Sequence, residues 1–294
     1  MAVYKRSFKA YNGPLTPAWS RFTVLSRFTF ATMFQSRPFT AFAVLCQVPL
    51  LIGVAYIYFV HSSTAQALLG LRFGRTPLIG NQWFSVFLYV QGWLGFILTA
   101  WSAPGMISKD FANNAVQLYL SRPISRAEYI LGKSGALVVL LSAVTWVPTL
   151  VLFFLQASMD GHGWLGEHFW MIGAILACSA LWIAVITLLA MATSVLAKWR
   201  IAATGLMLAI FFVVPGFGEV MNAILRTSWG KLLNLSYLFQ VIWAHLFRLQ
   251  LPDLVNSRLN MVPLWTAWAT MLTVCALSLL ILNARLKARE VEKR

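Results

Sequence analysis

Charged side chains are scarce in this sequence, and acidic side chains are the scarcest. Asp, Glu, Lys and Arg make up 11% of the 294 residues, and only 8 residues are acidic. Soluble domains carry about 25% charged residues, so this shortage excludes an ordinary soluble domain. Hydrophobic residues make up 60% of the chain and the mean hydropathy is +0.74. The composition therefore predicts an integral membrane protein.

Three further features are missing. The 3 cysteines, Cys46, Cys178 and Cys275, fall in different apolar segments, which argues against a disulfide framework. No short apolar stretch with a cleavage site precedes the first long apolar run, so we expect no signal peptide. The net charge of +15 is not gathered in a basic helix or a known recognition motif, so we expect no nucleic-acid partner.

Long windows without Asp, Glu, Lys or Arg indicate where the chain crosses the membrane. About 20 residues are needed to cross, and a central charge costs about 2.5–3.5 kcal/mol on the insertion scale. Pro49 and Pro148 lie inside two of these windows, where we expect local kinks. We therefore predict an all-α fold with six transmembrane helices in one domain, residues 38–294. The spans are 38–60, 83–103, 134–157, 169–197, 201–218 and 263–284.

Positive charge sets the predicted orientation. Six spans place residues 1–37, 104–133 and 198–200, together with the tail after residue 284, on one side. These segments hold most of the 23 Lys and Arg residues. Cytoplasmic segments of membrane proteins are enriched in Lys and Arg, so we expect both termini to be cytoplasmic.

Two helical elements are expected outside the spans. In the cytoplasmic leader, residues 1–37, a helix from Ala18 has one apolar side, and we interpret it as an interfacial helix. The alternative is that it simply continues the first span. Residues 232–247 are uncharged apart from His245, but a seventh span there would place the basic tail outside. We therefore assign residues 219–262 to short outer helices that lie at the interface or dip in and return.

A polar island, residues 104–133, separates the second and third spans. Pro104 and Gly105 end the second span. A new helix is predicted from about Met106 to Tyr119, with one apolar stripe at helical spacing. That stripe consists of Ile107, Phe111, Ala115 and Leu118. The amphipathic pattern suits either a docking helix or an ordinary cytoplasmic loop whose apolar side dips into lipid.

The helix after the island has a defined start. Ser125 and Glu128 fit a capping box, in which the serine side chain accepts from the amide three residues on and the glutamate reaches back. A fresh helix should therefore begin at Ser125 and continue into the third span. The island then consists of a short helix, a proline turn and a capped transmembrane helix.

The island resembles a segment of a known family. The run LYLSRPISR, residues 118–126, followed by Gly132 and Lys133, is similar to the segment between spans two and three of permease subunits in type-2 ABC exporters. Asp110 occupies the acidic position of that pattern. The sequence departs from the pattern, which has Gly, Thr and Glu, at Asn114, Ala115 and Gln117.

The resemblance implies an architecture and partners. Such permeases have six spans, cytoplasmic ends, an interfacial N-terminal helix and two short outer helices. Two permeases, identical or homologous, work together with two ATPases. The complex lies among the membrane lipids of the bacterial inner membrane. The helix of the island docks into a groove of the ATPase. The residues expected at this contact are Ile107, Ser108, Lys109, Asp110, Phe111, Asn114, Leu118, Arg122 and Pro123.

The function implied is ATP-driven export of an amphipathic or lipid-like substrate. The sequence has no G-x-x-x-x-G-K-[ST] phosphate loop, so we expect no ATPase activity in this chain and assign ATP and Mg²⁺ to the partner subunit. An ion-coupled transporter would hide charged residues inside its spans, and the six windows hold none. Two alternatives stay open: a non-transporting ABC motor in signalling or envelope assembly, and a membrane-embedded enzyme.

Two groups of polar residues lie on the opposite side of the membrane. One cluster has side chains that could bind a metal, but its spacing matches no known site, so we expect no metal. It comprises Asp160, His162, Glu167 and His168. Glu219, near the outer end of the fifth span, is a candidate for lining an exit at a dimer interface. Its alternative is an ordinary interfacial residue with its carboxylate in water.

Overall fold

The computed structural model describes residues 20–69, 79–113, 125–197, 199–249 and 262–291. Within these ranges the regular secondary structure is helical and contains no strand, which confirms the all-α prediction. Six helical stretches are long and apolar enough to cross a membrane, as predicted. They are Arg37–His61, Asn81–Ser108, Arg126–Asp160, Trp170–Leu196, Arg200–Leu225 and Leu264–Lys287.

The elements follow one another closely along the chain. The first half contains α1 (Arg21–Met33), α2 (Arg37–Leu45), α3 (Val48–His61), α4 (Ser63–Leu69), α5 (Asn81–Ser102), α6 (Pro104–Ala112) and α8 (Arg126–Val144). The second half contains α9 (Trp146–Asp160), α10 (His162–His168), α11 (Trp170–Leu196), α12 (Arg200–Leu208), η2 (Ala209–Val213), α13 (Val214–Leu225), η3 (Trp229–Leu233), α14 (Leu235–Leu246) and α16 (Leu264–Val291).

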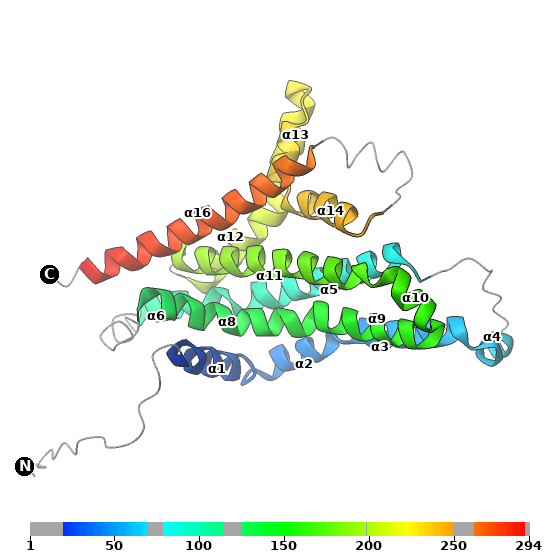
Figure 1. Ribbon diagram of the computed structural model, residues 1–294. Helices are drawn as coiled ribbons and strands as arrows, with labels where there is room; N and C mark the ends of the chain where they lie inside the picture. Colours follow the sequence, from blue (N-terminus) through cyan, green and yellow to red (C-terminus); the bar gives the residue numbers. More distant parts are fainter. Residues whose placement is uncertain (1–19, 70–78, 114–124, 198, 250–261, 292–294) are drawn as a thin grey trace, which may run out of the picture.

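Helices α5, α8, α9 and α11 lie side by side in an elongated bundle, whereas the fifth span rises away from it as α12 and α13, and α16 crosses obliquely (Figure 1). Helix α11 runs through it and contacts α5, α6, α8, α12, α14 and α16. The core beside α11 is aromatic: the centroid of the Trp182 ring lies 4.5 Å from that of Phe239 and 5.9 Å from that of Trp243. Helices α1 and α6 lie at one end of the bundle, and α4 and α10 lie at the other (Figure 1).

Both predicted proline kinks are present. The first span is divided between α2 and α3, and Pro49 lies in the first turn of α3. The third span is divided between α8 and α9, and Pro148 lies in the first turn of α9. Proline has no amide for the carbonyl four residues earlier, but the first turn of a helix needs no such donor. The first and third spans are therefore each built from two helices that meet just before the proline.

The fifth span is longer than predicted. It passes through the π-helical turn η2, where the Val214 amide reaches the Ala209 carbonyl, and continues as α13 to Leu225. The charge-free window ended at residue 218 because Glu219 follows it, whereas the helix continues past this single acid to Leu225. Glu219 consequently lies within α13, with an exposed side chain.

The leader contains a helix of its own. Helix α1 ends at Met33, and Phe34, Gln35 and Ser36 separate it from α2, so it does not continue the first span. It packs along α8 at one end of the bundle (Figure 1). The predicted separate N-terminal helix is therefore present, and its contact with α8 becomes important for the site described below.

The segment after the fifth span forms short helices, not a seventh span. Helix α14 has 12 residues, too few to cross a membrane. Asn234 caps it by accepting from the Tyr237 amide at 3.0 Å. Side chains such as Phe239 and Ile242 are fully buried, and α14 contacts α11 and α16. The segment therefore dips into the bundle and does not lie flat on its surface.

Candidate coupling site at one end of the bundle

Helix α6 is the first helix of the polar island. It begins at Pro104, just after α5 ends at Ser102, so a helix break lies where the second span was predicted to end, although the membrane-length apolar stretch continues to Ser108. Proline fits the first position of a helix because its missing amide would have no partner there. The helix begins two residues before the predicted Met106, and the predicted continuation to Tyr119 lies outside the described residues after 113.

The start of α6 is fixed to α11 by a buried serine. Ser194 Oγ accepts hydrogen bonds from the amides of Ile107, at 3.3 Å, and Ser108, at 3.2 Å. The same hydroxyl donates to the Pro104 carbonyl at 2.9 Å. Ile107 and Ser108 are the fourth and fifth residues of α6, so Ser194 links the first two turns of this helix to α11. This contact fixes where α6 begins relative to α11.

The middle of α6 is fixed to α8 by an ion pair. Lys133 Nζ lies 3.0 Å from Asp110 Oδ2, which also accepts a hydrogen bond of 2.7 Å from the Tyr129 hydroxyl. Lys133 Nζ also donates to the Met106 carbonyl at 3.3 Å. Tyr129 is fully buried and Lys133 is only 6% exposed. We call Asp110, Lys133 and Tyr129 the anchor cluster; its extra hydrogen bonds compensate for removing two charges from water.

Helix α8 in turn holds the leader helix α1. Ser26 Oγ donates to the Gly132 carbonyl at 2.8 Å. A Cβ on Gly132 would lie 2.8 Å from Leu25 Cβ, closer than side chains normally pack. Glycine therefore allows the two backbones to approach, which is a common device in membrane helix pairs. As a result α1, α8, α6 and α11 are joined at one end of the bundle.

The predicted apolar stripe requires a correction. Ile107 has an exposed fraction of 0% and belongs to the hydrophobic core, and Ser108 is also buried. Neither side chain lies on a surface that a partner could contact, so their predicted part in an ATPase contact is wrong for this arrangement. Of the predicted stripe, Ile107 is the member whose side chain is described, and it is buried. Asp110 likewise points to Lys133 and Tyr129, so it is an internal partner and not a rim charge.

The other residues predicted for docking are placed only in part. Lys109 and Phe111 lie in α6, which fixes their backbone positions. The remaining predicted contacts lie outside the described residues: Asn114, Leu118, Arg122 and Pro123. Asn113, which the docking prediction did not include, ends the described part of the segment with an exposed side chain. A partner protein could therefore reach the Asn113 side chain just after α6 ends.

The capping box is formed as predicted. The Ser125 amide donates to Glu128 Oε2 at 2.6 Å, and the Glu128 amide donates to Ser125 Oγ at 3.2 Å. Helix α8 consequently begins at Arg126 and continues without interruption into the third span. The cap fixes where α8 begins. It therefore fixes the positions of Tyr129 and Lys133, one and two turns later, where they contact α6.

The sequence analysis missed the partners of Asp110. Lys133 was counted with the island because it stands just before a charge-free window, yet it lies inside α8. Tyr129 and Lys133 are four residues apart and therefore share one face of the helix. A lysine in a helix that enters a membrane usually pairs with an acidic side chain, because an unpaired charge is costly there. The only acid of the preceding segment is Asp110.

The polar residues at the other end of the bundle form a different group. His61 Nε2 lies 2.8 Å from Asp160 Oδ1, and Gln156 donates to the same carboxylate. His168 instead stacks on Trp164, with ring centroids 4.4 Å apart. Among the described residues, no group of three or more His, Cys, Asp and Glu side chains is arranged to hold a metal.

Near the end of the fifth span, Glu219 influences Tyr237. Burial raises the pKa of the Tyr237 hydroxyl, and the Glu219 carboxylate raises this pKa further. Lys231 Nζ lies 5.2 Å from the centre of the Tyr237 ring. Glu219 thus belongs to a local arrangement of α13, η3 and α14 within one chain.

The fold and the joined helices can now be compared with known families. Residues 90–285, which include α6, the anchor cluster and four of the spans, match the family described as ABC-2 family transporter protein. No curated protein matches the chain. The matched region covers well over half of the sequence and contains the residues that carry the resemblance noted above. The chain therefore belongs to the ABC-2 transporter family and is the membrane subunit of an ABC transporter.

Proposed function

We propose that this chain is the permease of an ATP-driven exporter and that residues 104–133 receive movement from a separate cytoplasmic ATPase. Family membership implies an ABC ATPase partner. The observation that carries the proposal is the attachment of α6 to two different spans, by Ser194 on α11 and by Lys133 on α8. A displacement of the island would be passed to both spans.

The docking surface proposed for the ATPase leaves out the island residues whose side chains contact the interior of the chain. Ile107, Ser108 and Asp110 face the interior of the chain. The partner would therefore contact Lys109 and Phe111 with the exposed Asn113, and the part of the island that follows. ATP and Mg²⁺ would be bound by the ATPase, and two permeases, identical or homologous, would form the working unit with two ATPases.

The proposed substrate is amphipathic or lipid-like, and the proposed direction is outward. The apolar character of the spans supports this substrate class, because such spans offer few partners to a small ion. The charge bias supports placing α6, with both chain ends, on the cytoplasmic side of a bacterial inner membrane. Adding ATP to the medium around inside-out vesicles should produce substrate uptake, whereas a motor that does not transport would hydrolyse ATP without uptake.

Docking can be tested by co-purification with the ATPase. We expect Asn113→Trp to lower the amount of bound ATPase about tenfold, because a bulky ring at the exposed end of the segment would obstruct a partner. Phe111→Asp should have a similar effect. The matched control is Thr64→Trp, an exposed position on α4 at the other end of the bundle. Full ATPase binding and stimulation by both island variants would contradict the docking proposal.

A further inference from the structure

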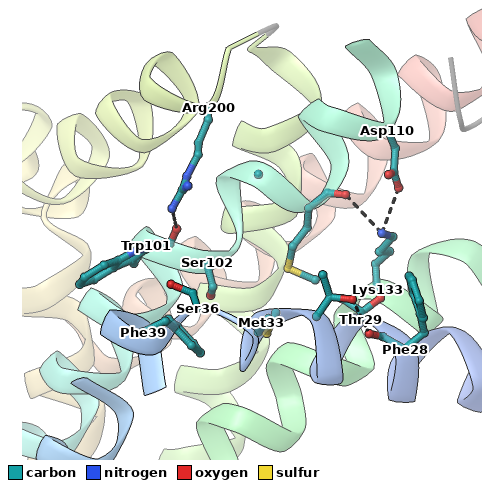
Figure 2. A pocket seen from close by; sticks show the side chains of 13 residues that line it. Phe28, Thr29, Met33, Ser36, Phe39, Trp101, Ser102, Asp110, Lys133 and Arg200 are labelled. Atoms are coloured by element: carbon teal, nitrogen blue, oxygen red, sulfur yellow. Dashed lines mark hydrogen bonds and ion pairs between the residues drawn. The ribbon is translucent and has the colours of Figure 1, made fainter. Parts of the chain in front are cut away.

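A pocket of about 290 Å³ lies beside the anchor cluster. Its walls come from α1, α2, α6, α8 and α12 and from the last turn of α5. Figure 2 shows Arg200 entering from one side and Lys133 from the other, with Thr29 and Met33 of α1 nearby. The volume suits a small polar headgroup and is at the low end of ligand pockets. Asn113, the described residue of the proposed docking surface whose side chain is placed, is not part of its lining.

The polar lining of the pocket favours an anion. Lys133 and Arg200 supply two cations, and Asp110 is the single acid in the lining. Arg200 Nη2 donates to the Trp101 carbonyl at 2.8 Å. A guanidinium has five N–H donors, so this bond leaves donors for a ligand oxygen. Arg200 is exposed and can adjust its position, whereas Lys133 is fixed by Asp110.

A buried hydroxyl in the lining has no partner in the described part of the chain. Thr29 is only 5% exposed, and its Oγ1 makes no hydrogen bond there. Its neighbour Thr32, one turn away, donates to the Phe28 carbonyl at 2.8 Å. Buried hydroxyl groups are nearly always hydrogen-bonded. Thr29 therefore lacks the acceptor that a ligand oxygen in this pocket would supply.

The outer part of the lining is apolar and faces outward. Phe28 is 61% exposed and Trp101 is also exposed, although both are large aromatic side chains. Trp101 lies in the last turn of α5, and Phe28 lies in the middle of the leader helix α1. Exposed aromatic side chains beside the end of a span are typical of the level of the lipid headgroups. The pocket thus combines a cationic floor with an apolar mouth at the membrane boundary.

We propose that this pocket binds the headgroup of an anionic phospholipid from the adjacent leaflet. The phosphate oxygens would accept from the Arg200 guanidinium, for which paired N–H donors are well suited, and from the Thr29 hydroxyl. The acyl chains would pass between Phe28 and Trp101 into the bilayer. A zwitterionic headgroup would bring its own ammonium group toward Arg200 and Lys133, and is therefore disfavoured. This site requires neither an ATPase nor a transported substrate.

Native mass spectrometry of the full-length protein in neutral detergent tests the proposal. Phosphatidylglycerol and phosphatidylcholine with the same acyl chains are titrated separately. We expect phosphatidylglycerol to bind more tightly, Arg200→Gln to weaken it about tenfold, and Thr29→Val to weaken it about threefold. The matched control is Arg285→Gln, which removes an exposed cation on α16 outside the pocket and should leave binding unchanged.

Competition with soluble glycerol phosphate identifies the source of the phosphate. We expect it to leave phosphatidylglycerol bound at equal concentration, because it cannot occupy the apolar mouth. Displacement at equal concentration would overturn the lipid proposal in favour of a soluble phosphate ligand. Equal binding of the two lipids would overturn it as well. So would equal losses from Arg200→Gln and Arg285→Gln, because they would show attraction to the overall positive charge.

Discussion

Replacing Lys133 with methionine tests the anchor cluster directly. Methionine keeps a long flexible side chain and removes the charge. Asp110 would lose the ammonium group 3.0 Å away but keep the 2.7 Å hydrogen bond from Tyr129. Breaking a buried ion pair costs about 3–5 kcal/mol. The Asp110 side chain is 16% exposed, so this variant should lose about 2–3 kcal/mol, somewhat below that range.

A double-mutant cycle separates the ion pair from general packing. Asp110→Asn removes the other charge, and the double variant with Lys133→Met leaves neither charge unpaired. The coupling free energy should exceed about 1 kcal/mol, beyond the additivity expected for independent sites. SDS unfolding in mixed micelles, followed by tryptophan fluorescence, measures it. The control Lys287→Met changes an exposed lysine on α16. The reasoning is refuted if Lys133→Met is as stable as this control, or if the two single changes are additive.

Two further predictions concern helix contacts and pH. Gly132→Ala should be about 1–3 kcal/mol less stable than Gly205→Ala, since both gain helix propensity but only the former places a Cβ against Leu25; unfolding curves compare them. Because the folded protein raises the pKa of Tyr237, its ionisation should reduce stability only above about pH 10. Tyr237→Phe should remove this loss of stability at high pH, and Glu219→Gln should lessen it. Unfolding measured from about pH 8 to 11 compares the variants with the wild-type protein. Identical pH profiles for the wild type and Tyr237→Phe would contradict the prediction.

Local rules in the sequence predicted much of the fold. Charge-free windows found the six spans because a membrane core excludes isolated charges over about 20 residues. Pro49 and Pro148 marked the kinks because the missing amide acts on its own helix. The capping box at Ser125 and Glu128 was predictable because its partners are three residues apart. Each of these features depends on neighbours in the sequence.

Contacts between distant segments were not predictable in the same way. The apolar stripe of α6 indicated that one face is covered, but not what covers it. In the structure the amide of Ile107 contacts Ser194, 87 residues away in the chain. Ile107 was therefore assigned to a contact with another protein, whereas its side chain is buried within this chain. Lys133 was predicted inside the helix that begins at Ser125 but outside the third span, because a window that excludes every charge must end at a lysine, even one that is paired.

The arrangement of α6 also restricts how movement could pass through the proposed permease. It is held near its start by Ser194 of α11, and its second turn is held at Asp110 by Lys133 of α8. Packed interfaces shift between discrete arrangements more readily than they deform. A short helix fixed at both points would therefore move as a rigid unit and carry the cytoplasmic ends of the third and fourth spans together. Because Ser26 joins α1 to Gly132 of α8, the leader helix would follow the same movement.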